Sequence, residues 1–271
     1  MMRNDRGVAL LIVLLVTALL IALIFEFAYG TRVSLRGAVN FRDSQRAYYL
    51  ARSGVNFAGM LMSENLKANL PQANLEQREW QPVPLVGESD AEIRVRWEDE
   101  GGKINISTVV KPYDAYKRLS ILFDLLGISQ DNLDRISAWM IEEKRNFRLI
   151  TELHQFLSEE EYAKVKDFVT VSPIVLININ TASSEVLQSL GLSPGQAGMI
   201  VDRRNREPFT KQEDMSALLG PEGARFVGML NVTSDVFKVN SFATVGGYTK
   251  QIEAGITRSS TGFTISYWRA L

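Results

Sequence analysis

Few side chains in this sequence could perform catalysis or hold a metal ion. Cysteine is absent and His154 is the single histidine, which excludes thiol nucleophiles, thiolate metal sites and histidine clusters. No nucleophile motif surrounds His154, so we expect no enzymatic activity. Two acidic pairs, Glu142-Glu143 and Glu159-Glu160, offer the oxygen ligands that calcium prefers. They are the candidate calcium ligands, and a solvated acidic face is the favoured alternative.

A glycine-containing turn followed by basic residues is the second candidate site. Residues 179–197 resemble a helix-hairpin-helix module, in which backbone N–H groups and nearby basic side chains hold DNA phosphates. The resemblance implies DNA contacts at Gly191, Gly195, Arg203 and Arg204. Taken alone, it indicates a DNA-uptake receptor.

Charge argues against DNA as the partner of this module. Residues 178–215 carry four basic and five acidic side chains, whereas affinity for duplex DNA comes largely from neutralising its phosphates. Pro194 also lacks the backbone N–H that a phosphate-binding turn supplies. We therefore favour a compact helical module, in which Thr181 caps the first helix and Gly191 ends it in a left-handed conformation.

The first structural element expected in the chain is an apolar N-terminal helix. Fourteen of the eighteen residues 8–25 are Leu, Ile, Val or Phe, and as a helix they would span about 27 Å, close to the hydrocarbon core of a bilayer. Three interpretations are open: a secretory signal cleaved near residues 28–30, a simple membrane anchor, or a prepilin leader. The run is long for a signal, and the helical pattern continues past residue 30, which favours a retained helix.

The arrangement Arg6-Gly7-Val8, directly followed by an apolar helix, resembles type IV pilins and type II secretion pseudopilins. The resemblance implies that a membrane prepilin peptidase cuts after Gly7 and methylates Val8. Most members carry Glu at the fifth mature position, where this chain has Ile12. In assembled pilins that buried carboxylate pairs with the amino terminus of the subunit above, as a charge in a membrane requires. Ile12 therefore predicts a subunit with no neighbour stacked on it.

Strand patterns flank the middle of the chain. The helical pattern that follows the membrane segment should end at Pro71. Residues 91–97 alternate apolar and charged side chains, which predicts a half-buried strand, and residues 103–110 are expected to return beside it. The C-terminal part predicts an antiparallel set with turns at Gly246-Gly247 and at residues 259–262.

An internal repeat lies between these strands. Residues 125–129 align with 189–193, and residues 168–172 align with 230–234, at offsets of 64 and 62 residues. Each copy contains an apolar helical pattern, a basic loop and an acidic helix start. We therefore expect two similar helix-hairpin-helix or SAM-like modules inserted between strands of one sheet.

The predicted fold class is α+β, with a long N-terminal helix on an antiparallel sheet and a large all-helical insertion. The expected boundaries, in chain order, are a leader at 1–7, a transmembrane helix at 8–25, its continuation at 26–70, the first part of the β-domain at 71–119, the insertion at 120–235 with repeats at about 120–172 and 182–235, and C-terminal strands at 236–271.

The order of these features resembles the K-type minor pseudopilins of type II secretion, the general secretion pathway protein K family, over essentially the full length. Residues 100–106, Ile12 and the paired helical modules carry the resemblance. It implies a non-enzymatic subunit at the tip of the pseudopilus, with a single inner-membrane span and a periplasmic globular domain. Its partners would be I- and J-type minor pseudopilins, the major pseudopilin, the prepilin peptidase and the inner-membrane assembly platform.

Two questions stay open at this point. The family binds calcium in its helical domain, but residues 138–143 lack the aspartate spacing of its ligands. A related type IV pilus system could also use such a subunit as a minor pilin. A membrane-anchored DNA receptor is the third, less favoured function, and nucleic acid the less favoured partner.

Overall fold

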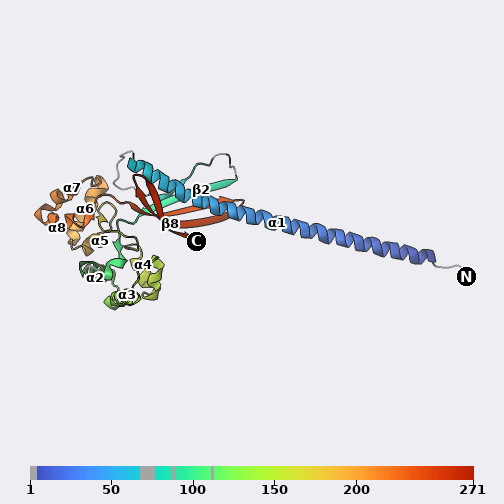
Figure 1. Ribbon diagram of the computed structural model, residues 1–271, viewed down its shortest axis with the longest axis horizontal. Helices are drawn as coiled ribbons and strands as arrows, with labels where there is room; N and C mark the ends of the chain where they lie inside the picture. The colour runs from blue at the N-terminus through green and yellow to red at the C-terminus, as the bar shows by residue number, and fades with distance from the viewer. Residues whose placement is uncertain (1–4, 68–76, 86, 88–89, 111–112) are drawn as a thin grey trace.

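The computed structural model describes residues 5–67, 77–85, 87, 90–110 and 113–271. Figure 1 shows a long helix that crosses one face of a β-sheet, and a helical region beyond one end of that sheet. The predicted α+β class is confirmed. The long helix and the main sheet are formed by α1 (Asp5–Lys67), β1 (Gln77–Pro82), β2 (Ala91–Asp99), β7 (Val236–Val245), β8 (Tyr248–Ser259) and β9 (Gly262–Ala270).

Helix α1 is continuous over 63 residues, a length of about 95 Å at 1.5 Å per residue. Residues 7–42 are exposed, and the helix then packs on the sheet through a buried stripe of small and apolar side chains: Ala47, Ala51, Val55, Ala58 and Met62. Among the described residues, α1 is the one helix long and apolar enough to cross a membrane. The expected helix end at Pro71 lies outside the described residues.

Two glycines set the distance between α1 and the sheet. A Cβ atom at Gly54 would lie 2.2 Å from Ser241 Oγ, and one at Gly59 would lie 2.7 Å from the Phe263 ring. Although each glycine lowers helix propensity, both allow strands to approach the helix more closely than any side chain would permit. From the sequence alone, these glycines predict only a lower helix propensity and not the close approach of the strands.

The main sheet has the order β1-β2-β7-β8-β9, and each pair of neighbours is antiparallel. Strand β2 pairs along its whole length with β7, so the intervening residues 100–235 form an insertion between adjacent strands. One face of the sheet packs under α1 through apolar residues such as Val95, Val239 and Ala254. The two predicted C-terminal turns connect β7 to β8 and β8 to β9.

The expected return strand at residues 103–110 is wrong. Only Ile104–Asn105 is extended (β3), and it pairs in parallel with β4 (Val169–Thr170). Residues Ile106–Val110 form a 3₁₀ helix, η1. The apolar residues of this stretch alternate as predicted, but Ile104 and Ile106 are buried in the core of the helical region, and β7 occupies the position beside β2.

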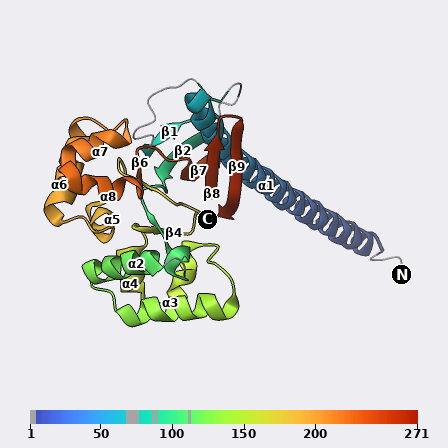
Figure 2. The same ribbon diagram turned by 60° about the vertical axis from the view of Figure 1, so that its left-hand side comes forward.

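The helical region consists of two modules of similar layout, shown side by side in Figure 2. The first module is formed by β3, η1, α2 (Tyr113–Leu126), α3 (Gln130–Glu143), η2 (Ile150–Gln155), α4 (Glu159–Val165) and β4. The second module is formed by β5 (Ile177–Asn178), α5 (Ser184–Ser189), α6 (Pro194–Arg206), α7 (Gln212–Leu219), η3 (Gly220–Gly223), α8 (Ala224–Val227) and β6 (Leu230–Asn231). The insertion was expected to start at residue 120, which lies within α2. Because β2 ends at Asp99, the insertion instead starts at residue 100.

The two modules repeat the same local geometry. Gly127 and Gly191 both have positive φ angles, of 65° and 103°, at the end of a helix. The side chains of Ser129 and Ser193 then cap the N-termini of α3 and α6. In each module a short parallel pair, β3–β4 or β5–β6, joins the entry of the chain to its exit. The internal repeat is therefore a repeat of structure as well as of sequence.

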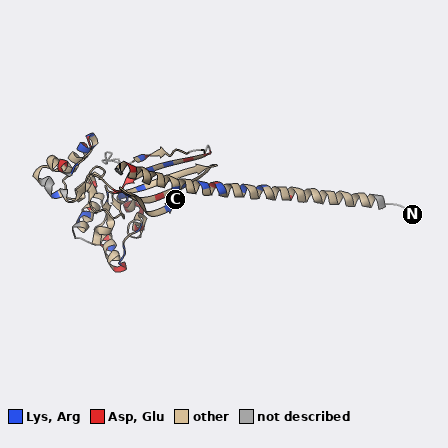
Figure 3. Cartoon of the chain, turned by 45° about the horizontal axis from the view of Figure 1, so that its top comes forward, with Lys and Arg blue, Asp and Glu red and all other residues tan. Residues whose placement is uncertain are grey.

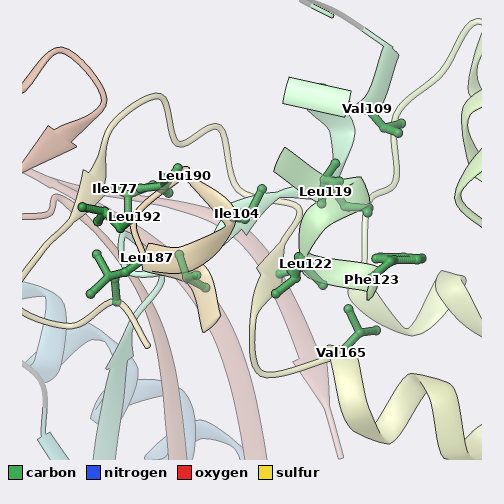
Figure 4. Packing of buried hydrophobic residues seen from close by; sticks show 14 of the residues in the cluster. Ile104, Val109, Leu119, Leu122, Phe123, Val165, Ile177, Leu187, Leu190 and Leu192 are labelled. Atoms are coloured by element: carbon green, nitrogen blue, oxygen red, sulfur yellow. The ribbon is translucent and has the colours of Figure 1, made fainter. Parts of the chain in front are cut away.

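Buried apolar side chains form two separate clusters. One lies between α1 and the sheet, and the other fills both modules. In Figure 4, Ile104 lies between Leu119 and Leu122 of α2 on one side and Leu187 and Leu190, at the end of α5, on the other. The two modules thus share one core, and the contact between that core and the sheet has to be made by other groups.

Candidate functional site

The residues predicted for processing lie on the exposed part of α1. Val8 is 52 % exposed and Ile12 is 58 % exposed. In the cartoon of Figure 3, the apolar part of α1 carries no blue or red segment, in agreement with the sequence from Gly7 to Phe25. Cleavage after Gly7 and methylation of Val8 stay predictions; both residues are exposed in the first turns of α1.

The four candidate calcium ligands have other neighbours. Glu142 and Glu143 are exposed at the end of α3. The carboxylate of Glu159 lies 3.5 Å from His154 Nδ1, and that of Glu160 lies 3.0 Å from Lys164 Nζ. Within the described ranges, no group of three or more His, Asp or Glu side chains is arranged to hold a metal ion. The structure thus does not assemble the predicted glutamates into a ligand set.

The candidate DNA-contact residues are spread over the second module. Gly191 follows α5 with the expected left-handed backbone, and Gly195 lies in the first turn of α6. Arg203 pairs with Glu207 at 3.2 Å and lies over the Phe209 ring. Arg204 donates a hydrogen bond to the carbonyl oxygen of Ile179 at 2.8 Å and another to that of Ala182. Both arginines are therefore engaged within the module.

The helix cap of this module differs from the expectation. Ser183, and not Thr181, caps α5, because its side chain accepts a hydrogen bond from Val186 N at 3.1 Å. The hydroxyl of Thr181 instead donates to the Asp99 carboxylate at 2.6 Å. A tertiary contact thus replaces the local cap, and Arg204 fixes the carbonyl groups on either side of Thr181.

Arg204→Gln is expected to lower the free energy of unfolding by about 2 kcal/mol, because two carbonyl oxygens lose a charged donor. Arg206, which is exposed and donates to the carbonyl oxygen of Asp202 in its own helix, provides the matched control. Arg206→Gln should change stability by less than about 0.5 kcal/mol. Urea unfolding of the full chain in detergent measures both, and equal effects would contradict an internal role for Arg204.

A polar junction, which we define as Asp99, Glu100, Lys103, Asn178 and Thr181, joins the helical region to the sheet. Asp99 is the last residue of β2 and is 3 % exposed. Its carboxylate accepts hydrogen bonds from Asn178 Nδ2 at 2.7 Å, from Thr181 Oγ1 at 2.6 Å and from the backbone N of Gly101 at 2.7 Å. Asp99 therefore holds the second module.

The next residue holds the first module in the same way. Glu100 accepts a hydrogen bond from the hydroxyl of Thr170 in β4, and its other carboxylate oxygen lies 2.6 Å from Lys103 Nζ. The backbone N–H of Asn178 also donates a hydrogen bond to the carbonyl oxygen of Gly101, at an N···O distance of 2.8 Å. Two consecutive acidic residues thus fasten the two modules to one strand.

Burial raises the pKa of the Asp99 carboxyl above its ordinary value, while hydrogen bonds from Ser234, Thr181, Gly101 and Asn178 act in the opposite direction. Removing these donors would be costly, because a buried carboxylate needs hydrogen-bond partners in place of water. Because its contacts are with other parts of the same chain, the polar junction is suited to fixing the orientation of the modules rather than to transforming a substrate.

The residues that enter the two modules are also similar in sequence. Residues 104–108 read Ile-Asn-Ile-Ser-Thr and residues 177–181 read Ile-Asn-Ile-Asn-Thr. The side-chain oxygens of Asn105 and Asn178 both accept a backbone N–H from two residues further on. The repeat therefore extends to the entry strands β3 and β5, and the second of these strands carries Asn178.

Comparisons with known proteins agree with this architecture. The family model described as type II secretion system (T2SS), protein K, matches residues 177–240, which include the second module. The type II secretion system protein K of Pseudomonas aeruginosa is 27 % identical, over 97 % of this chain and 91 % of its own length.

A solved structure has the same fold. It belongs to the GspK-GspI-GspJ complex of the type 2 secretion system from enterotoxigenic Escherichia coli, with a TM-score of 0.63, 16 % identity, and coverage of 88 % of this chain and 99 % of that chain. The resemblance predicted from the sequence is therefore confirmed: the chain is similar to protein K of type II secretion over nearly its whole length.

Proposed function

We propose that this chain is a tip subunit of the type II secretion pseudopilus, which initiates or caps assembly for protein export across the outer membrane. Its apolar helix would hold it in the inner membrane before assembly, with the globular part in the periplasm. The complete absence of cysteine suits an oxidising compartment. Its partners would be I- and J-type minor pseudopilins, as in the complex that contains the GspK structure.

The position of the two modules is the observation that carries the proposal. They lie beyond the end of the sheet that is farthest from the N-terminus of α1 (Figure 1). In a fibre whose subunits are aligned along their N-terminal helices, this end faces the next subunit above. A further subunit would meet the bulk of the modules there, and it would find Ile12 where an acidic partner for its amino terminus is needed.

The exposed side of α1 supports helical partners in the assembly. Beyond the apolar segment, the helix still exposes large side chains, among them Phe27, Leu35, Phe41, Tyr49 and Met60, each more than half exposed. Exposed apolar surface of this extent is typical of a site that another protein covers. Because this surface continues from the apolar N-terminal end of α1, a partner with its own long N-terminal helix fits it best.

Replacing Gly7 with leucine is expected to abolish N-terminal processing, since the small residue before the cut would be lost. Mass spectrometry of the membrane-extracted chain would then show the intact leader, whereas the unsubstituted chain would begin at methylated Val8. Gly30→Leu is the matched control, because nothing lies within 4 Å of Gly30 on the same helix. An unsubstituted chain that begins near Thr31 would overturn both the prepilin leader and the retained anchor.

A further inference from the structure

The two edges of the main sheet are protected to different degrees. At one edge, β1 pairs irregularly with β2 and ends in Pro82. At the other edge, β9 has nine residues without proline or lysine and pairs, within the described sheet, with β8 alone. Proline and lysine on an edge strand are usual means of preventing edge-to-edge association, and β9 contains neither. The outer side of β9 therefore offers backbone groups to another chain.

A groove beside β9 adds a second observation. We call it the edge groove: a cavity of about 390 Å³ between the open face of the sheet and the segment that links the two modules. Val171, Pro173 and Leu149 line one side of it, and the open face of the sheet lines the other, through Val236 of β7, Thr257 of β8 and Tyr267 of β9. A mainly apolar groove that reaches an edge strand suits an extended segment, which can bond the outer side of that strand and place alternate side chains in the groove.

A β-bulge shapes this end of the strand. Ile265 pairs with Ile256 and Tyr267 pairs with Gly255, so Ser266 is an extra residue in β9. A Cβ at Gly255 would lie 2.4 Å from Ser266 Oγ, so glycine leaves space for the bulge. Bulges commonly occur beside functional sites, where they redirect side chains. Beyond it, Tyr267 lines the edge groove, whereas Trp268 lies on the face under α1, where its ring is 5.1 Å from the guanidinium carbon of Arg52.

Charge defines the segment further. Arg148 is the one charged residue among those that line the edge groove. Its side chain is exposed, and the neighbouring Glu152 carboxylate accepts a hydrogen bond from the Arg148 backbone N at 2.8 Å and lies 3.7 Å from Arg145 Nη2. An occupant that brings an acidic side chain to this point would give the arginine a planar, two-point partner.

We propose that β9 and the edge groove receive an extended, apolar segment of a partner pseudopilin, with an acidic residue opposite Arg148. The inference rests on the proposed function, because that function supplies the partner. It assigns a surface that is separate from the exposed side of α1, so a partner would hold this subunit at two places. Backbone bonds to β9 would provide affinity, and the contact with Arg148 would provide register.

The absence of cysteine in the chain allows a direct test. Single cysteines replace two exposed strand threonines, Thr264→Cys in β9 and Thr249→Cys in β8 as the matched control. The full chain is prepared in detergent alone and in complex with its I- and J-type subunits. Maleimide labelling of Thr264→Cys should become at least tenfold slower in the complex, while that of Thr249→Cys stays the same.

A charge reversal tests the acidic contact. Arg148→Glu should reduce recovery of the partner subunits at least tenfold, whereas Arg206→Glu, at an exposed arginine of the second module, should leave recovery unchanged. If either cysteine variant fails to fold, hydrogen exchange of β9 in the unsubstituted chain replaces labelling, and protection gained only in the complex supports the proposal.

The outcomes separate the two proposals. A complex that forms while β9 stays equally reactive and unprotected would overturn the edge groove and leave the proposed function standing. Failure of the unsubstituted chain to bind either subunit would overturn both.

Discussion

Replacing Asp99 with alanine is expected to lower the free energy of unfolding by about 3 kcal/mol at pH 5. Asn178, Thr181 and the backbone N of Gly101 would all lose their acceptor in a site that is 3 % exposed. Leaving a buried donor unsatisfied costs about 1–3 kcal/mol. The three donors surround one carboxylate, so their individual costs do not simply add. Urea unfolding of the full chain in detergent measures the loss.

The effect of this substitution should depend on pH. Because burial raises the pKa of Asp99 above its ordinary value of 3.8, the native state holds the proton more tightly than the unfolded chain does. Its contribution to stability is then complete below that value and decreases as the pH rises through the native pKa. The difference between the wild type and Asp99→Ala should therefore be smaller at pH 7.5 than at pH 5.

A surface aspartate provides the control for this prediction. Asp90 is paired with Arg46 at 3.2 Å, but more than half of its side chain is exposed. Asp90→Ala should cost less than about 1 kcal/mol, as is usual for exposed ion pairs. Equal losses for the two variants would contradict a structural role for the polar junction.

Replacing Gly102 with alanine is expected to lower the free energy of unfolding by about 2–3 kcal/mol. The new Cβ would lie 2.7 Å from Thr181 Oγ1, 2.8 Å from Thr181 C and 2.9 Å from Ala182 N. Two of these atoms are backbone, so relief requires the second module to move away from β2, and overpacking of this kind costs about 1–3 kcal/mol.

A helical glycine offers the matched control. Nothing lies within 4 Å of Gly198 in α6, so Gly198→Ala should stabilise the chain by about 0.5–1 kcal/mol through helix propensity. If Gly102→Ala lowers the free energy of unfolding while Gly198→Ala raises it, the loss at Gly102 comes from packing at the polar junction. If Gly102→Ala were as stable as wild type in urea unfolding, the close approach would be refuted.

Elements with a repeated local pattern could be predicted from the sequence. The apolar stripe of α1, the alternation in β2 and β8, and the glycine-serine pairs at Gly127-Ile128-Ser129 and Gly191-Leu192-Ser193 each encode their own conformation. The modules were also recognisable, because the offset between copies is nearly constant. In these cases local preference and tertiary packing favour the same structure.

Predictions failed where tertiary contacts decide the conformation. Strand β1 has no apolar alternation and exists because it pairs with β2. Ile104 and Ile106 have a strand pattern, but the chain turns away at Gly101-Gly102 and buries both residues in the core of the modules. Thr181 has the residue type of a helix cap and instead contacts Asp99, 82 positions earlier in the chain. A local sequence pattern cannot encode contacts between residues that lie so far apart in the chain.

Helix α1 has one mechanical consequence. It runs without interruption over 63 residues from its apolar end to the top of the sheet, and a hydrogen-bonded helix transmits an axial push along its whole length. Any thrust delivered at the anchored end would therefore reach the far end as a displacement of equal size. From there it would pass through the sheet to the modules at the end of β2, where the hydrogen bonds of Asp99 and Glu100 hold both modules.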